Sequence, residues 1–297
     1  MGNPLNHLSG SEWLYWTNTI YPTNYPPDPT HRLRKRHGAI KPPELMAEII
    51  CFFTKRGELV VDPFAGVGST LLGAALVDRK AVGIELNMEW VRVYQEITAG
   101  FSVKEQRLVE GLAGRKIGGL MLPGDCLKEL KKFPTGQVAA VITDPPYGCN
   151  HRVDFTAETN FSMYNPGEDK DFGNTPNLST YLEKMAEFAR EALRILIPRR
   201  YLVVLIGDRY LNGEYYPLSF KVAEVIQKVG FKWKGMRIWW NQATQRPLRP
   251  YAINKCFVSN ITHQNILIFR KGVSVKLLKV LAGNNLWKKE EETHIQR

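Results

Sequence analysis

The sequence predicts an α/β fold with a mostly parallel sheet and helices on both faces. Strand-like and helix-like segments alternate along most of the chain, which is typical of a parallel sheet. The last two predicted strands follow each other without a helix between them, so the final strand is expected to run antiparallel to the others. There is no second core, internal repeat or low-complexity linker, and we therefore expect one domain over residues 1–297.

The first half of the chain supplies the early strand–helix steps. A helix is expected to begin at Pro42-Pro43, because proline is favoured in a first turn, and apolar residues continue at helical spacing to Phe53. Residues 101–118 are polar and contain glycine, and we expect a helix fragment or an excursion there. The other predicted elements are strands over 59–61, 80–86 and 120–122 and helices over 69–77 and 88–99.

The second half continues the alternation around one long irregular segment. Residues 148–177 show no period and are too long for an ordinary connection, which indicates a functional segment. Residues 1–40 form an aromatic and basic N-terminal extension, and residues 272–297 are expected to form an amphipathic helix. The predicted elements are strands over 138–143, 201–206, 234–240 and 265–269 and helices over 178–196 and 218–229.

Composition excludes several classes of protein. The hydrophobic content of 44% is enough for a full core. No apolar stretch is long enough for a membrane span, and the N-terminus does not resemble a signal peptide. The 4 cysteines form no C-x-x-C motif and have no histidine neighbours at metal spacing. We expect a reducing, cytoplasmic location, in a prokaryotic cell or from a phage gene, and no metal site.

The positive charge is concentrated in the C-terminal third. The net charge is +11, yet residues 225–289 contain 13 Lys or Arg and no Asp or Glu. A second basic cluster lies at residues 31–41. A soluble basic surface is a common explanation for such charge, but a stretch of this length without acids favours a polyanionic partner.

A glycine-rich turn links the first predicted strand to its helix, in VVDPFAGVGST at residues 60–70. Gly66 and Gly68 permit a tight turn, and the helix start offers free N–H groups. The turn has no P-loop lysine, and Leu71 stands where a dinucleotide fingerprint has its third glycine. Asp62 would repel a pyrophosphate but would favour a cationic ligand.

Two further acids follow later strands. Glu85 ends the second strand, where such folds place an acid to bind ribose hydroxyls. Asp125 follows the third strand, where it can meet an adenine amino group. Each signal is weak alone, but together with Asp62 they describe an adenosine pocket without a phosphate clamp. S-adenosylmethionine fits that description, because its sulfonium is positive and it has no phosphate.

The strand at 138–143 runs into TDPPYG, residues 143–148. Two prolines end the strand, because they cannot donate to a ladder. Asp144 and the Pro145 carbonyl are two acceptors in a stiff arrangement, able to bind the two hydrogens of an exocyclic amine on a nucleobase. Pro146 stiffens the turn and Tyr147 offers a face for stacking. This is positioning and electrostatic stabilisation of a base that must be flipped out of a duplex.

These motifs together resemble the amino-methylating DNA methyltransferases, which modify adenine N6 or cytosine N4. KPPELMAEII (residues 41–50) resembles the family segment that packs beside the methionine moiety, and the similarity continues through residues 191–208, 230–240 and 263–272. The resemblance implies a seven-stranded, Rossmann-like methyltransferase sheet with a reversed last strand. It also implies S-adenosylmethionine as the cofactor and double-stranded DNA as the partner, with a cognate restriction endonuclease as a candidate second partner.

The resemblance also implies the residues of the site. The catalytic set is Asp144, Pro145, Pro146 and Tyr147. The cofactor-binding set is Lys41, Pro42, Asp62, Pro63, Phe64, Ala65, Gly66, Gly68, Ser69, Thr70, Glu85, Leu86, Asp125, Cys126 and Asp144.

Two irregular segments are candidates for target recognition, residues 148–177 and 241–263. The second is free of acids and rich in residue types that contact base edges. A solvated loop is the competing interpretation, mainly for 148–177. The candidate DNA-binding residues are Arg152, Asn241, Gln242, Arg246, Arg249, Tyr251 and Lys255.

Adenine is favoured over cytosine, because the family's cytosine enzymes typically carry serine in place of Asp144. Methylation at cytosine C5 is excluded, since it needs a Pro-Cys nucleophile and the chain has no such dipeptide. A tRNA guanosine-N2 methyltransferase remains an alternative, because that class shares DPPYG. A non-enzymatic nucleic-acid-binding protein would have lost Asp144 or Gly66, and a nicotinamide oxidoreductase would keep the third glycine.

Overall fold

The computed structural model describes residues 3–148, 170–211, 213–243, 248 and 255–273. The candidate residues Arg152, Arg246, Arg249 and Tyr251, most of the segment 148–177 and the expected helix at 272–297 lie outside the described residues. Within the described part of the chain, no helix combines the length and apolar character that crossing a bilayer requires.

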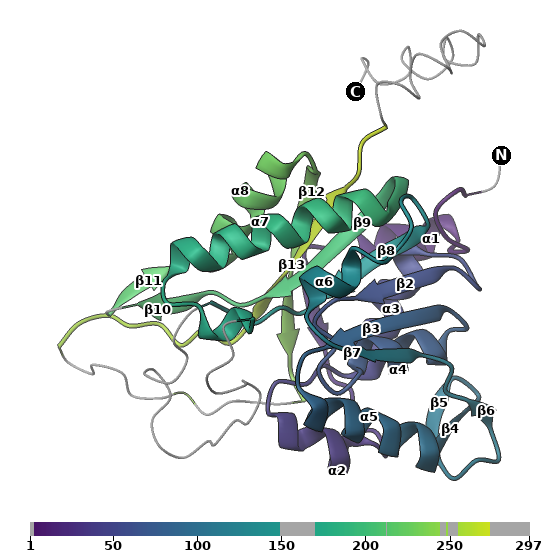
Figure 1. Cartoon of the computed structure of the whole chain (residues 1–297). Helices are drawn as coiled ribbons and strands as arrows, with labels where there is room; N and C mark the ends of the chain where they lie inside the picture. The colour runs from purple at the N-terminus through teal and green to yellow at the C-terminus, as the bar shows by residue number, and fades with distance from the viewer. Residues whose placement is uncertain (1–2, 149–169, 212, 244–247, 249–254, 274–297) are drawn as a thin grey trace, which may run out of the picture.

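Eight strands form the main sheet, in the order β1-β12-β13-β9-β8-β2-β3-β7 (Figure 1). β13 is antiparallel to both of its neighbours, whereas the other pairs are parallel, so the predicted mostly parallel sheet with a reversed last strand is confirmed. The strands are β1 (Ile20–Thr23), β2 (Leu59–Asp62), β3 (Lys80–Glu85), β7 (Leu120–Pro123), β8 (Val138–Thr143), β9 (Leu196–Ile206), β12 (Lys232–Asn241) and β13 (Gln264–Arg270).

The predicted number of seven strands is wrong, because the N-terminal extension contributes β1 to the β12 edge of the sheet. β1 has only four residues and includes Pro22, which the sequence pattern does not mark as a strand. Proline is tolerated there because an edge strand needs backbone donors on one side only. β9 also begins earlier than predicted, at Leu196, and the preceding helix ends at Ile195.

Helices cover both faces of the sheet (Figure 1). On one face lie α3 (Pro43–Phe53), α4 (Ser69–Leu76) and α5 (Met88–Gly100). On the other lie α6 (Cys126–Leu130), α7 (Leu178–Ile195) and α8 (Leu218–Val229). Alternate strand residues serve the two cores: Val60 packs on the first face and Val61 on the second, because successive side chains of a strand point to opposite sides.

Residues 101–118 form a small antiparallel sheet, so the helical expectation for this segment is wrong. Its strands are β4 (Phe101–Lys104), β5 (Arg107–Glu110) and β6 (Arg115–Lys116). Glu105 and Gln106 join β4 to β5 with φ of 49° and 58°, which are the left-handed values of a two-residue hairpin turn. This turn usually carries Asn-Gly or Asp-Gly, so the residues at these two positions do not indicate a hairpin.

Two further elements lie beside the carboxyl edge of the main sheet. β10 (Arg209–Leu211) and β11 (Glu214–Tyr216) pair as a short hairpin that the sequence did not predict. A single 3-10 turn, η2 (Phe172–Asn174), precedes α7.

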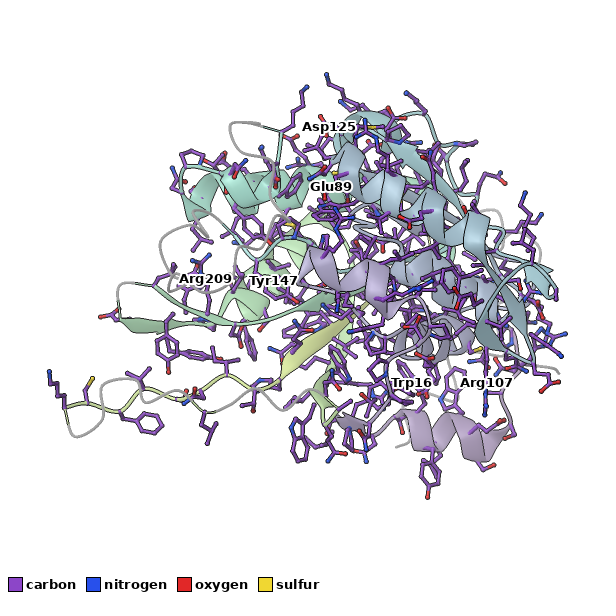
Figure 2. All side chains as sticks on the ribbon, turned by 90° about the horizontal axis from the view of Figure 1, so that it is seen from below. Trp16, Glu89, Arg107, Asp125, Tyr147 and Arg209 are labelled. Carbon is purple, nitrogen blue, oxygen red and sulfur yellow. The ribbon has the colours of Figure 1, made fainter. Side chains whose placement is uncertain are left out.

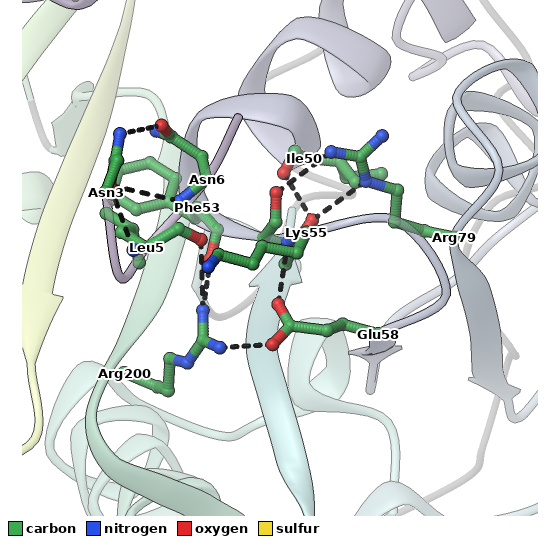
Figure 3. A network of polar contacts seen from close by, with 10 residues as sticks. Asn3, Leu5, Asn6, Ile50, Phe53, Lys55, Glu58, Arg79 and Arg200 are labelled. Carbon is green, nitrogen blue, oxygen red and sulfur yellow. Dashed lines mark hydrogen bonds and ion pairs between the residues drawn. The ribbon is translucent and has the colours of Figure 1, made fainter. Parts of the chain in front are cut away.

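The N-terminal extension is built into this fold. It contains α1 (Gly10–Trp16), α2 (His31–Arg34) and the 3-10 turn η1 (Lys35–His37). Arg200 of β9 donates to the carbonyls of Leu5 and Phe53 and forms an ion pair with Glu58 (Figure 3). These bonds join the chain start to α3 and to the centre of the sheet.

Arg237 of β12 joins α1 to the sheet edge. Its guanidinium carbon lies 4.1 Å from the ring centroid of Trp16 and 3.8 Å from that of Tyr21. Its Nε donates to the Asn18 carbonyl at 2.7 Å, and the residue is only 4% exposed. A desolvated cation between two rings makes a strong cation–π contact, so Arg237 fixes α1 and β1 on β12.

We expect Arg237→Met to destabilise the protein by about 2–4 kcal/mol, because it removes the stacked cation and the bond to Asn18. Urea unfolding would measure the change. Lys234→Met, which removes an exposed positive charge from the same strand, is the matched control and should change stability by less than about 0.5 kcal/mol. Equal losses of stability in the two variants would show that the ring contacts and the Asn18 bond of Arg237 do not contribute to the free energy of unfolding.

Candidate active site

The candidate site lies where the strand order reverses. β2 and β8 are neighbours, and the chain passes from β2 to β3 and β7 on one side and from β8 to β9 on the other. Asp62 is the last residue of β2, and Asp144 directly follows β8. A reversal of this kind opens a crevice at the carboxyl ends of the strands, where ligands of open α/β sheets bind.

The glycine turn needs both of its glycines. Gly66 and Gly68 have φ of 50° and 85°, and Gly68 caps the start of α4. A Cβ on Gly68 would lie 2.3 Å from the Tyr94 ring, and one on Gly66 would lie 3.1 Å from Nε2 of His37. A side chain at Gly68 would therefore displace Tyr94, whose hydroxyl donates to the Gly119 carbonyl at 3.0 Å.

Asp62 holds the turn, α4 and β8 together. Its carboxylate accepts from the Thr70 hydroxyl, from the Thr143 hydroxyl at 2.5 Å and from the Phe64 N–H at 3.1 Å. The residue is 3% exposed, and burial raises its pKa to about 6. The three donors offset part of the cost of burying the carboxylate.

Glu85 connects the end of β3 to the glycine turn. Its two oxygens accept from the N–H groups of Gly66 at 2.8 Å and Asn87 at 2.7 Å. Burial raises the pKa of Glu85 to about 7. Among the described residues, neither Asp62 nor Glu85 has an ion-pair partner.

The remaining cofactor candidates follow β7 and the glycine turn. Asp125 caps α6, with its Oδ1 accepting from the Leu127 N–H at 2.9 Å. Cys126 is buried, and burial raises the pKa of its thiol. Phe64 packs edge-on against Phe172, with ring centroids 4.8 Å apart. Pro63 and Ala65 are buried, and Leu86 is half-buried.

These residues suit a cationic adenosine ligand. Two carboxylates at strand ends, buried Asp62 and half-buried Glu85, have no positive partner among the described residues. A phosphate would meet these carboxylates unfavourably, whereas a sulfonium and ribose hydroxyls would not. No group of three or more His, Cys, Asp or Glu in the described parts of the chain is arranged to hold a metal ion.

Residues 28–41 form a strap that lies against the glycine turn. Buried Arg34 forms an ion pair with Asp28 and donates to the Lys41 carbonyl at 3.0 Å and the Ser69 hydroxyl at 3.1 Å. His37 packs on Trp90, with ring centroids 5.0 Å apart, and burial lowers its pKa to about 4. Apart from Lys41, which was expected among the cofactor-binding residues, the sequence indicated only a basic cluster in this strap.

Four positive charges of the strap are paired within the chain. The pairs are Arg32–Glu110, Arg34–Asp28, Arg36–Glu89 and Lys41–Asp144. The net positive charge of this cluster is therefore smaller than its number of basic residues suggests. The expectation of a polyanionic partner rests mainly on the acid-free stretch, residues 225–289. A count of basic residues cannot show which of them already have partners.

The DPPY corner, residues 144–147 directly after β8, carries a continuous chain of hydrogen-bonded polar side chains. Asp144 accepts from the Tyr147 hydroxyl at 2.7 Å and forms an ion pair with Lys41. The Tyr147 hydroxyl in turn accepts from the Gln264 amide, and Arg209 donates to the Tyr147 carbonyl at 3.0 Å (Figure 2). Asp144 and Tyr147 were predicted from sequence as catalytic residues, whereas Lys41 was predicted as a cofactor-binding residue.

Three residues at this corner were missed by the sequence analysis: Gly207, Arg209 and Gln264. A Cβ on Gly207 would lie 3.1 Å from the Tyr147 ring, so its absence makes room for that ring. Arg209 and Gln264 lie 62 and 117 residues from Tyr147 in the chain. No local pattern links positions so far apart.

The candidate DNA-binding residues that are described lie at two places. Asn241 ends β12 and is half-buried, and Gln242 and Lys255 are exposed. The segment 255–263 runs beside the hairpin, because Ser259 exchanges hydrogen bonds with the Tyr210 hydroxyl at 2.8 and 2.9 Å. We call the hairpin 209–216 together with the segment 255–263 the arm.

A family model described as DNA methylase, of the N6/N4 type, matches residues 6–96 and 138–295. The chain belongs to this family. The family resemblance drawn from the sequence is therefore confirmed, and S-adenosylmethionine is the methyl donor of this family.

Curated relatives share shorter segments. The type II methyltransferase M2.MboI of Moraxella bovis is 39% identical over 67 residues, 21% of this chain and 24% of the relative. The DNA adenine methyltransferase YhdJ of Escherichia coli K12 is 33% identical over 89 residues, 29% of each chain. A tRNA (guanine(10)-N2)-dimethyltransferase of Methanocaldococcus jannaschii is 30% identical over 95 residues, 32% of this chain and 24% of the relative. The matches thus span about a quarter of each relative's length.

Among solved structures, TTHA0409 of Thermus thermophilus, complexed with S-adenosyl-L-methionine and described as a DNA modification methylase, is 25% identical. The alignment covers 51% of this chain and 54% of that chain, with a TM-score of 0.35.

The raised pKa of Glu85 predicts a pH-dependent affinity for S-adenosylmethionine. If Glu85 binds the ribose hydroxyls, as the sequence predicts, affinity should rise as pH increases through about 7, because the ionised carboxylate is the better acceptor for hydroxyl donors. Glu85→Gln should bind about 10-fold more weakly and lose this pH dependence, since hydrogen bonds to a charged group contribute roughly 1.5–3 kcal/mol. Calorimetric titration between pH 5.5 and 8.5 would measure both effects.

The matched control for this experiment is Glu96→Gln, at an exposed position on α5. It should keep the wild-type affinity and pH profile. The ligand-free protein should show the opposite trend in stability: a raised carboxyl pKa favours folding at low pH, and that contribution is lost as pH rises through about 7. A wild-type affinity that does not change with pH would contradict the role of Glu85.

Proposed function

We propose that this chain is a DNA methyltransferase that methylates the exocyclic N6 amine of a flipped adenine. The observation that carries the proposal is the position of Asp144 and Pro145 at the end of β8, next to the strand that ends in Asp62 and the glycine turn. Membership of the N6/N4 DNA methylase family supports it.

The cofactor side of the site is assigned to the residues around the glycine turn. Glu85 binds the ribose hydroxyls, Asp125 the adenine amino group, and Asp62 and the N-terminus of α4 the methionine side. When bound, S-adenosylmethionine would supply a methyl group: an N–C bond forms, the C–S bond breaks with its electron pair on sulfur, and one amine proton passes to water. Pro42, Pro63, Phe64, Ala65, Gly66, Gly68, Ser69, Thr70, Leu86 and Cys126 complete the proposed pocket.

The acceptor side orients the amine. Asp144 and the Pro145 carbonyl accept its two hydrogens, which localises the nitrogen lone pair that the ring otherwise withdraws. Pro146 keeps the two acceptors in register, and the Tyr147 ring stacks on the base. Tyr147 is itself oriented by Asp144, Gln264 and Arg209, so the stacking surface and the carboxylate are fixed together.

Adenine is proposed as the base because the corner carries Asp144 in the DPPY form. Similarity to a DNA adenine methyltransferase of Escherichia coli supports this choice. The alternative is a tRNA guanosine-N2 methyltransferase, which the sequence DPPYG and the similarity to the Methanocaldococcus enzyme favour.

The arm is proposed to contact the DNA around the flipped base. Both parts of the arm are anchored at Tyr147. Arg209, the first residue of the hairpin, donates to the Tyr147 carbonyl, and Gln264, directly after the segment 255–263, donates to the Tyr147 hydroxyl. The segment belongs to the acid-free stretch, and it presents Lys255 and Phe257, of which Phe257 is 91% exposed. Phosphates attract the basic side chains, and an exposed aromatic ring can stack on bases.

The wider setting follows from these assignments. We propose that residues 1–297 act as one catalytic domain on double-stranded DNA in a prokaryotic cytoplasm. Similarity to a type II methyltransferase supports a cognate restriction endonuclease as a partner. Residues 148–177 and 241–263 are the proposed recognition insertions.

The function is tested by supplying labelled S-adenosylmethionine with either unmethylated DNA or unmodified tRNA, followed by digestion to nucleosides and mass analysis. We expect labelled N6-methyl-2′-deoxyadenosine from the DNA and no labelled nucleoside from the tRNA. N4-methyldeoxycytidine would contradict the choice of base, and label in tRNA alone would contradict the choice of polymer.

Asp144→Asn is the control for this assay, because it keeps the side-chain volume and removes the charge. It should lose at least 100-fold in methylation rate while binding S-adenosylmethionine within about threefold of wild type, since Asp144 orients the acceptor. Loss of cofactor binding together with activity would mean that Asp144 has a structural role.

We expect Phe257→Ala to weaken DNA binding about 10-fold, because a base–aromatic stack contributes roughly 1–3 kcal/mol. Fluorescence anisotropy with labelled DNA would measure it. Tyr15→Ala is the matched control: Tyr15 is 86% exposed on α1, at the opposite end of the molecule from β10 and β11 (Figure 1). Unchanged binding by Phe257→Ala would remove this ring from the interface.

A further inference from the structure

Lys41 is joined to the acceptor carboxylate. Its ammonium forms an ion pair with Oδ2 of Asp144, across 103 residues of sequence. The side chains are 6% and 18% exposed, so water screens this pair much less than a surface pair. The sequence resemblance placed Lys41 with the cofactor-binding residues, but its charged end contacts the other half of the site.

Arg34 holds the backbone of Lys41 in place. Nη1 of Arg34 donates both to the Lys41 carbonyl and to the hydroxyl of Ser69, the first residue of α4. Nε of the same guanidinium donates to the Thr30 hydroxyl at 2.8 Å, and Nη2 pairs with Asp28. A planar guanidinium with donors on three sides fixes the origin of the Lys41 side chain relative to the glycine-turn helix.

Asp144 is thus bound from both sides. Tyr147 donates to Oδ1 and Lys41 to Oδ2, so rotation of the carboxylate would break one bond or the other. An ionised carboxylate has about four acceptor sites, so both donors can stay while a third hydrogen is accepted. The two donors therefore fix the orientation of the carboxylate and leave acceptor sites free for a further hydrogen.

We propose that Lys41 is a positioning residue for the acceptor amine, which acts by holding the Asp144 carboxylate in the orientation that accepts an amine hydrogen. This role rests on the proposed function of Asp144 and reassigns Lys41 from cofactor binding to the acceptor side. A carboxylate held by one donor only would sample orientations in which the amine is not aligned for attack. Small misplacements of this kind lower rates strongly.

The role differs in a measurable way from the two simpler ones. A contact of the cofactor would control the affinity for S-adenosylmethionine. A purely structural ion pair would control stability, because an uncompensated buried charge destabilises the fold. A positioning residue controls the rate of methyl transfer with cofactor bound.

The test uses Lys41→Met, which keeps the length of the apolar stem, and Lys41→Gln, which keeps a neutral N–H donor. Cofactor affinity is measured by calorimetry, the transfer rate constant by single turnover with saturating cofactor, and stability by thermal unfolding. Lys132→Met is the matched control, because Lys132 pairs with Glu129 at an exposed position, with a side chain 69% exposed.

We expect Lys41→Met to lower the rate constant at least 30-fold with cofactor affinity within threefold of wild type. Lys41→Gln should retain more of the rate, because it can still donate to Asp144, and Lys132→Met should match wild type. Lower affinity with an unchanged rate constant would overturn the proposal in favour of cofactor binding. Lower stability with both other quantities unchanged would overturn it in favour of a structural pair.

The assay uses whichever nucleic acid the wild-type chain methylates, so an error in the proposed base or polymer does not affect it. A wild-type chain that methylates neither DNA nor tRNA would contradict the proposed function, whereas a wild-type rate in both Lys41 variants would contradict the role of Lys41 alone. If Lys41→Met shows no cooperative thermal transition and is therefore not folded, the measurements on Lys41→Gln decide the outcome.

Discussion

The site depends on the hydrogen bonds that the Asp62 carboxylate accepts from Thr70 and Thr143. Thr143 is the last residue of β8, directly before Asp144, and Thr70 lies in the first turn of α4. One buried carboxylate therefore sets the distance between the glycine turn and the DPPY corner. A methyl transfer between two bound molecules needs that distance to be constant, and backbone pairing of β2 with β8 alone would leave the strand ends free to move apart.

The strap adds a second connection between the same two halves, from outside the sheet. Arg34 joins it to α4 and Lys41 joins it to Asp144, while His37 lies against Gly66 of the turn and packs on Trp90. The two connections differ in chemistry. Asp62 is held by neutral hydroxyl and amide donors, whereas Asp144 is held by a cation, which leaves the acceptor carboxylate compensated in charge before any ligand is present.

The parts of this site that sequence could predict are those at strand ends. Asp62, Glu85 and Asp144 could be placed together because the carboxyl ends of parallel strands meet at one edge of the sheet. The reversed β13 followed from the missing helix between the last two strands. The residues that support this site were not predictable. Arg34 contacts Lys41 and Ser69, and Arg209 and Gln264 contact Tyr147, through tertiary packing that leaves no period or spacing in the chain. Local signals were also overlooked: Ser9 and Glu12 form a capping box at the start of α1, which a four-residue pattern can reveal.

The eighth strand has a consequence for how the molecule meets copies of itself. The carbonyls of Thr19 and Thr23 accept from the N–H groups of Ile238 in β12 and Gln242 directly after it. The alternation of a strand therefore turns the backbone groups of Ile20 and Pro22 toward the open side. The N–H of Ile20 is already bonded to the Asn18 side chain, and Pro22 has none. Within its four residues, β1 therefore presents no free backbone N–H at its outer edge. A strand from a neighbouring molecule that needs these donors cannot pair with this edge. The short N-terminal strand thus protects the β12 side of the sheet from the addition of a further strand.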